Sequence, residues 1–142
     1  MTFFDAVGAF HERFRLPVAG LSKPCQSMTP ENLAYRLKFL IEELNEFEQA
    51  AARDDLTQMA DALADLVYVA LGTAHYLGIP FNAVWIEVQR SNLAKELRRL
   101  GDTDHKRGSV EVIRKPPDWK PPAIAELIAA HNAQVGDEGD VA

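Results

Sequence analysis

The stretch that decides the fold is residues 30–77, PENLAYRLKFLIEELNEFEQAAARDDLTQMADALADLVYVALGTAHYL. Thr29 is a good helix cap and Pro30 suits a first helical turn, so a helix is predicted to start here. Its apolar residues recur every three to four positions as far as about Arg53: Leu33, Leu37, Leu40, Leu44, Phe47 and Ala51. After a break at Asp54-Asp55, the same kind of pattern predicts a second helix over about 56–77.

Shorter helices are predicted on either side of this pair. Phenylalanine and valine residues at helical spacing predict a first helix over about 3–14. Gly78-Ile79-Pro80 ends the second long helix and starts another, which is expected to run to about Leu100. Residues 102–120 are expected to be mostly loop, with Val110 and Val112 as candidates for a short strand, and a last helix is expected from Pro121 to about 133.

The predicted fold class is all-α. Because the links between helices are short, neighbouring helices should pack antiparallel, which gives a four-helix-bundle core with an additional short C-terminal helix. This single domain is expected to span residues 1–134, and the small, acidic tail, 135–142, is expected to be disordered. A bundle of this size leaves an apolar face uncovered, so a homodimer or larger homo-oligomer is expected.

Composition narrows the possible partners and location. The chain has 142 residues, 47% of them hydrophobic, and a net charge of -6, which argues against nucleic acid as a partner. A single cysteine, Cys25, excludes an internal disulfide and fits the reducing cytoplasm. The amino terminus does not resemble a signal peptide. Residues 66–86 lack Asp, Glu, Lys and Arg but contain glycine and proline, so buried helices are expected there and not a membrane span.

Carboxylates are concentrated on the two long helices. At about 100° per residue, Glu43 and Glu46 lie beside the apolar seam of the first, while Glu42 lies farther round. Asp61 and Asp65 share a face of the second, and Asp65 is the only charged residue from 62 to 74. A helix so apolar is normally buried, and a buried lone carboxylate needs a proton, a partner or a bound cation.

An antiparallel hairpin turning near residue 54 would bring these carboxylates to matching heights. Glu43 lies eleven residues before the turn and Asp65 eleven after it, while Glu46 lies eight before and Asp61 seven after. Like charges that converge in this way require cations, and hard oxygen ligands suit Mg²⁺ or Mn²⁺. The alternative is a solvated acidic face with ordinary intrahelical pairs.

The spacing resembles that of the MazG-like all-α nucleoside triphosphate pyrophosphohydrolases, which include the dimeric dUTPases and the phosphoribosyl-ATP pyrophosphohydrolases. The resemblance rests on Glu42-Glu43-Leu44-Asn45-Glu46 and on residues 61–65, where Ala62 replaces the glutamate of the family pattern. Residues 87–95, EVQRSNLAK, and 112–122, VIRKPPDWKPP, resemble two segments of one subgroup, with Gln89 in place of its usual histidine. The resemblance as a whole covers about residues 30–125.

This resemblance implies hydrolysis between the α and β phosphates of a nucleoside triphosphate, releasing the monophosphate and pyrophosphate. A deoxynucleotide such as dUTP is the expected substrate, and Mg²⁺, with Mn²⁺ as a substitute, is the expected cofactor. Glu42 would activate water and Lys95 would stabilise phosphate charge; the expected metal ligands are Glu43, Glu46, Asp65 and Asp61. The expected substrate contacts are Asn92, Lys95, Tyr68 and Lys115.

Two other interpretations stay open. One is a phosphoribosyl-ATP pyrophosphohydrolase, and the other is a non-catalytic helical interaction module with a degenerate acidic site. The alanine at position 62 is the feature that favours the second of these.

Overall fold

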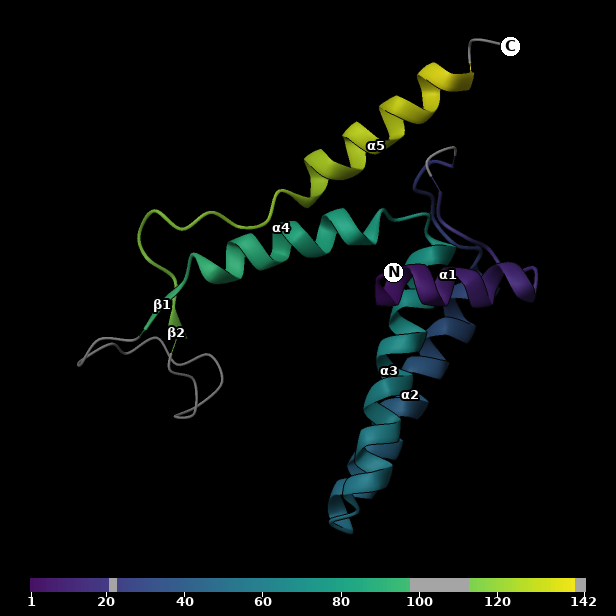
Figure 1. The fold of residues 1–142 in the computed structure, drawn as a ribbon, viewed down its shortest axis with the longest axis vertical. Helices are drawn as coiled ribbons and strands as arrows, with labels where there is room; N and C mark the ends of the chain where they lie inside the picture. Colours follow the sequence, from purple (N-terminus) through teal and green to yellow (C-terminus); the bar gives the residue numbers. More distant parts are fainter. Residues whose placement is uncertain (21–22, 98–112, 140–142) are drawn as a thin grey trace.

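The computed structural model describes residues 1–20, 23–97 and 113–139 (Figure 1). The all-α class is confirmed: the described residues form five helices and one two-stranded antiparallel pair. The elements are α1 (Phe3–Arg13), α2 (Pro30–Ala52), α3 (Leu56–Tyr76), α4 (Phe81–Leu93), β1 (Glu96–Leu97), β2 (Ile113–Arg114) and α5 (Ile124–Gly139).

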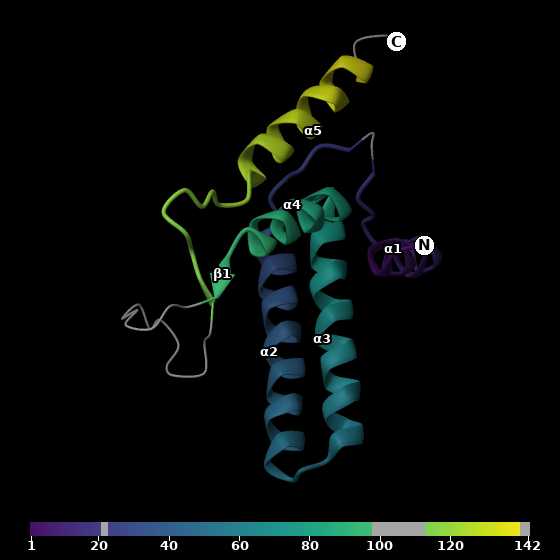
Figure 2. The same ribbon diagram turned by 60° about the vertical axis from the view of Figure 1, so that its left-hand side comes forward.

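The two long helices, α2 and α3, form the predicted antiparallel hairpin (Figure 2). The side chain of Thr29 accepts a hydrogen bond from the Asn32 amide, and that of Asp55 accepts one from the Gln58 amide, so both helices are capped at their first turn. Between them Asp54 adopts a positive φ of 53°, a conformation that aspartate tolerates better than most residues. The hairpin therefore turns where the sequence predicted it.

Helix α1 packs against α3 near the open end of the hairpin, and two histidines fasten it there. His75 of α3 stacks on the Phe4 ring, with 3.8 Å between the centroids. Its Nε2 donates to the Phe4 carbonyl at 3.0 Å, while its Nδ1 accepts from the Ala19 amide at 3.1 Å. His11 of α1 donates through Nδ1 to the Pro17 carbonyl at 2.6 Å. Both rings therefore have backbone hydrogen-bond partners.

Protonation of His75 is expected to destabilise the fold in acid. Burial lowers the pKa of His75 below its usual value of 6.5, because a charged ring would lose water and its Nδ1 would lose the Ala19 hydrogen bond. As the pH falls below about 6.5, His75 takes up a proton in the unfolded chain but not in the folded chain, so the free energy of unfolding falls. Urea unfolding at pH 8 and pH 5.5 should show this loss in the native sequence and a smaller one in His75→Gln. An equal loss in both proteins would contradict the assignment.

The chain turns less sharply between α3 and α4 than the antiparallel prediction required. The two helix axes are bent by 118° at a link in which Gly78 has a positive φ of 66°. As a result α4 extends away from the hairpin, and α5 packs on α4 (Figure 1). No single helix within the described residues is long and apolar enough to cross a membrane; α3 and α4 satisfy such a test only as this bent pair.

Two predicted helix ends are wrong. Helix α4 ends at Leu93 and not near Leu100, because Glu96 and Leu97 pair with Arg114 and Ile113 in β2. The strand candidates Val110 and Val112 lie outside the described residues. Helix α5 continues to Gly139, past the expected end at 133, so residues 135–139 of the expected disordered tail are helical. Alanine and glutamine at positions 133 and 134 favour helix and do not stop it.

One chain leaves much of the hairpin's apolar surface uncovered. About half of the side-chain surface stays exposed at several positions on both helices: Leu33, Leu37, Ile41, Leu44, Leu63 and Val67. Contiguous exposed apolar surface of this kind marks interaction sites in soluble proteins.

Candidate active site

A cavity of about 360 Å³ opens between α1, α2 and α3, beside the hairpin. Glu43 of α2 and Asp65 of α3, which the sequence predicted at matching heights, both line it. Aromatic and histidine side chains, together with one arginine, form the rest of its wall: Phe10, His11, Leu16, Tyr35, Arg36, Phe39, Tyr68, Val69 and Tyr76.

Glu43 is the electrostatic centre of this site. Its side chain is only 7% exposed, and its Oε2 atom is buried without a hydrogen-bond partner among the described residues. Burial raises the pKa of Glu43, and the negative charges of the other acidic residues raise it further: Glu46, Asp65, Glu42 and Asp61. The other four carboxylates singled out from the sequence are therefore close enough to Glu43 to affect its charge.

Burial is distributed differently from the sequence-based expectation. Asp65 was expected to be the buried carboxylate, because α3 is apolar around it, but its side chain is exposed. The reason is that Asp65 lies on the wall of the cavity, which a single chain leaves open to solvent. The buried carboxylate is Glu43, on the helix that looked more polar.

The donor chemistry suits a hard cation, although the side chains are not gathered around one point. Within the described residues, no group of three or more His, Cys, Asp or Glu side chains is arranged to hold a metal ion. The unpartnered oxygen of Glu43, in a cavity it shares with Asp65, is nonetheless what a carboxylate ligand leaves when its cation is removed.

The four predicted substrate contacts separate into two groups. Tyr68 lines the cavity, with its ring edge-on to Phe10 at 5.5 Å between centroids. Asn92 and Lys95 lie at the far end of α4, where the Lys95 ammonium donates to the Asn92 side chain at 2.8 Å. Lys115 lies over the Trp119 ring at 4.1 Å. Within one chain these last three do not line the cavity.

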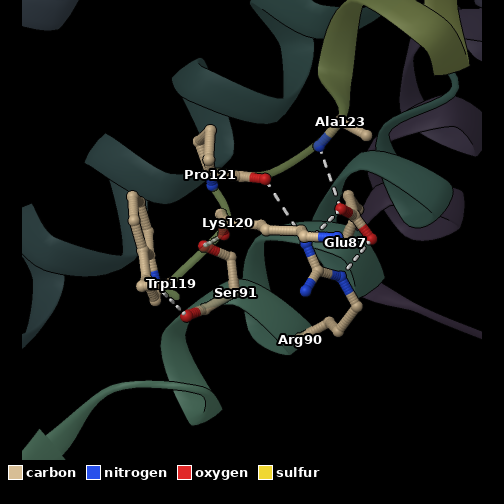
Figure 3. Close-up of polar contacts among 7 residues, drawn as sticks. All are labelled: Glu87, Arg90, Ser91, Trp119, Lys120, Pro121 and Ala123. Atoms are coloured by element: carbon tan, nitrogen blue, oxygen red, sulfur yellow. Dashed lines mark hydrogen bonds and ion pairs between the residues drawn. The ribbon is translucent and has the colours of Figure 1, made fainter. Parts of the chain in front are cut away.

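The two segments that carry the subgroup resemblance interlock (Figure 3). A carboxylate oxygen of Glu87 accepts the Ala123 amide at 2.9 Å, and Glu87 also forms an ion pair with Arg90 at 2.7 Å. The Trp119 indole donates to the Ser91 carbonyl at 2.8 Å, and the Ser91 hydroxyl donates to the Lys120 carbonyl at 3.3 Å. These residues fasten α4 to the start of α5, a role that the sequence analysis did not assign to them.

Breaking this fastening at Glu87 is expected to loosen the start of α5. The hydrogen bonds from Arg90 and from the Ala123 amide lower the pKa of Glu87 to about 2, so the ionised carboxylate is the form that makes them. Glu87→Gln removes the charge, and the Ala123 amide should then exchange hydrogen about tenfold faster. Glu126→Gln, an exposed change on α5, is the control. Unchanged protection of Ala123 in Glu87→Gln would show that this carboxylate is not what holds the segment.

The sequence analysis also missed Arg36 and Tyr76. Arg36 is 6% exposed and reaches from α2 to the Thr73 hydroxyl at 3.1 Å and to the Val69 carbonyl, so it ties the hairpin together beside the cavity. A signal was present: Arg36 lies seven residues before Glu43, which is two helical turns and therefore the same face. Tyr76 carried no comparable signal.

Fold and site together define an all-α protein with a cavity that contains two carboxylates and lies between α1 and an antiparallel pair of helices. The family model of phosphoribosyl-ATP pyrophosphohydrolase matches residues 7–92, which is more than half of the chain and includes every residue that lines the cavity. The chain belongs to this family, which is part of the MazG-like all-α nucleoside triphosphate pyrophosphohydrolase superfamily. It is a nucleotide pyrophosphohydrolase. No curated protein matches the chain significantly.

Proposed function

We propose that this chain hydrolyses a nucleotide between its α and β phosphates in a metal-dependent reaction, releasing a nucleoside monophosphate and pyrophosphate. The proposal rests on a buried carboxylate oxygen of Glu43, in the cavity lined by Asp65, that has no hydrogen-bond partner in the part of the chain that the structure describes. A carboxylate in that position gains most from a bound cation, and a cation is what makes an acidic cavity attractive to a triphosphate.

The proposed ligands are oxygen donors from both helices of the hairpin: Glu43, Glu46, Asp65 and Asp61. When bound, Mg²⁺, or Mn²⁺ in its place, would neutralise the developing charge on the phosphates. Glu42 accepts a proton from the attacking water, whose oxygen bonds to the α phosphorus as the bond to the bridging oxygen breaks and pyrophosphate leaves. Tyr68, on the cavity wall, packs against the ribose or base.

We further propose that the active unit is a homodimer or a dimer of dimers. The exposed apolar faces of α2 and α3 need a cover, and α4 carries Asn92 and Lys95 away from its own hairpin (Figure 1). In an assembly of two copies, the phosphate-charge role of Lys95 and the substrate contacts of Asn92 and Lys115 would be supplied to the hairpin of the partner copy.

Two substrates are candidates for this reaction. Phosphoribosyl-ATP is favoured by the family match over residues 7–92. A deoxynucleotide such as dUTP is favoured by the resemblance of residues 87–95 and 112–122 to another subgroup, whose two segments contact each other here.

The test is to incubate the purified protein with Mg²⁺, and separately with Mn²⁺, and each member of a substrate panel. The panel contains nucleoside and deoxynucleoside triphosphates and phosphoribosyl-ATP, and both pyrophosphate and monophosphate are measured. Equal amounts of the two products would support the proposal and name the substrate. Release of single phosphates would contradict cleavage between the α and β phosphates. No release together with no thermal stabilisation by Mg²⁺ would support a non-catalytic helical module instead.

A further inference from the structure

Helix α5 lies beyond residues 7–92, the part of the chain that the family match covers, and it is attached to the rest of the protein at two places. Its start is held on α4 by the contacts drawn in Figure 3. Eight positions after Ala123, the side chains of His131 and Asn132 contact the segment that precedes α2. A helix attached only at its start could swing, whereas two attachments along its length fix its direction.

The second attachment is made with the backbone of residues 23–25. Nε2 of His131 donates to the Lys23 carbonyl at 2.8 Å, and the side-chain oxygen of Asn132 accepts from the Cys25 amide at 2.8 Å. These backbone groups lie outside helices and strands, so the two side chains of α5 supply the partners that regular structure would supply. His131 is 8% exposed, so little water competes for its hydrogen bond.

The same segment is fastened to the link between α3 and α4. The Gln26 amide donates to the Leu77 carbonyl at 3.0 Å, and the Cys25 thiol donates to the Gly78 carbonyl at 3.3 Å. The backbones approach closely here, because a Cβ atom at Gly78 would lie only 2.7 Å from the Pro24 carbonyl oxygen. This segment therefore connects α5 to the point where the chain bends between α3 and α4.

These contacts close a triangle at the bend. Its first side is α4 from the link to Glu87, its second is α5 from Ala123 to His131, and its third is residues 23–26. The third side leads directly into α2, which packs on α3, so it belongs to the hairpin. A triangle with fixed sides has fixed angles, and α5 therefore holds the 118° bend between α3 and α4.

The direction of α4 matters because Lys95 lies just beyond its far end. At 1.5 Å per residue, Lys95 lies about 20 Å from the link, so a swing of α4 by about 10° would move it by about 4 Å. A displacement of about 1 Å in a group that acts on the substrate can lower the rate about 100-fold. Small changes in the bend therefore have large effects at this lysine.

We propose that α5 is a brace for the active site, in which His131 and Asn132 are positioning residues that place Lys95 against the substrate phosphates. The inference rests on the proposed function, because it takes Lys95 as the residue that stabilises phosphate charge at the hairpin of the partner copy. Neither His131 nor Asn132 lines the cavity. Both act through the direction of α4.

Replacing Asn132 tests the brace. Asn132→Leu removes the acceptor of the Cys25 amide at similar side-chain volume, and kcat should fall at least about 10-fold. Stabilisation by Mg²⁺ should not change, because the proposed ligands lie on the hairpin. Asn132→Asp keeps the accepting oxygen and should retain most of the activity. Gln134→Leu, at an exposed position of the same helix, is the matched control and should keep full activity.

A double-variant cycle shows whether the effect passes through Lys95. Lys95→Met removes the ammonium group that the brace is proposed to place, so adding Asn132→Leu to it should lower kcat by no more than about threefold. A loss in the Lys95→Met background as large as that in the native sequence would overturn the proposal, and so would full kcat in a folded Asn132→Leu.

Spin labels separate this inference from the proposed function, because they report the direction of α4 without substrate. One label is placed at Glu48→Cys on the hairpin and one at Ala94→Cys at the end of α4, both exposed positions, in protein diluted with unlabelled copies. The background is Cys25→Ser, whose hydroxyl keeps a donor for the Gly78 carbonyl. The distance distribution should be narrow and should broaden with Asn132→Leu. An unchanged distribution would overturn the brace, whereas a broadened one in a protein that hydrolyses no nucleotide would keep the brace and overturn the proposed function.

Discussion

Asp65→Asn is expected to lower turnover by at least about 100-fold while leaving the protein folded. The amide has the shape of the carboxylate but lacks its charge, so it binds a hard cation far less well. Asp65 is exposed in the single chain and lies on a helix that keeps its apolar contacts, so the unfolding midpoint in the absence of metal should hardly change. Steady-state pyrophosphate release with Mg²⁺ and a thermal unfolding curve without it measure the two effects.

The matched control for this change is Glu48→Gln. Glu48 is an exposed carboxylate on α2, in the same hairpin but outside the cavity. Glu48→Gln changes the net charge by the same amount as Asp65→Asn, so a general electrostatic effect on substrate approach would appear in both variants. Full activity in Asp65→Asn would remove this residue from the ligand set, and an equal loss in Glu48→Gln would show that the effect is not local.

The hairpin and its register could be predicted because they follow from local rules. Helical periodicity, two capping residues and one turn near residue 54 determine which residues of α2 face which residues of α3. The facing of Glu43 and Asp65 follows from counting along the two helices. The end of α4 could not be predicted in this way, since Glu96 and Leu97 lie beyond the helix and pair with residues eighteen and sixteen positions later.

The burial of individual carboxylates also could not be predicted from the sequence. The pattern around Asp65 says that α3 is apolar, but not which chain covers it. Glu43 is buried in the hairpin, where α2 packs along α3, and α3 comes from another part of the sequence. The same limit applies to residues 87–95 and 112–122. Their resemblance to a subgroup can be recognised from the sequence, whereas the contacts of Trp119 and Ala123 with α4 exist only in the folded chain.

Glu43→Gln is expected to separate stability from activity. In the protein without metal, Glu43 has a buried carboxylate oxygen with no hydrogen-bond partner among the described residues. Burial raises the pKa of Glu43, and repulsion by four other acidic side chains raises it further. A neutral amide of the same size removes that repulsion, so the unfolding midpoint without metal should stay the same or rise by a few degrees. Turnover should fall at least about 100-fold, and stabilisation by Mg²⁺ should be lost, because the most buried proposed ligand is gone.

The comparison is made by thermal unfolding of the native sequence, Glu43→Gln and Glu48→Gln, each with and without Mg²⁺. The native sequence and Glu48→Gln should gain stability with Mg²⁺ and Glu43→Gln should not. If Glu43→Gln is less stable than the native sequence without metal, the Glu43 carboxylate has a structural partner and its role is packing. If it is as stable but still responds to Mg²⁺ as the native sequence does, the cation binds elsewhere. A buried carboxylate oxygen that has no hydrogen-bond partner among the described residues calls for a functional explanation. Unchanged or higher stability together with a loss of turnover is therefore the outcome that a metal ligand at this position predicts.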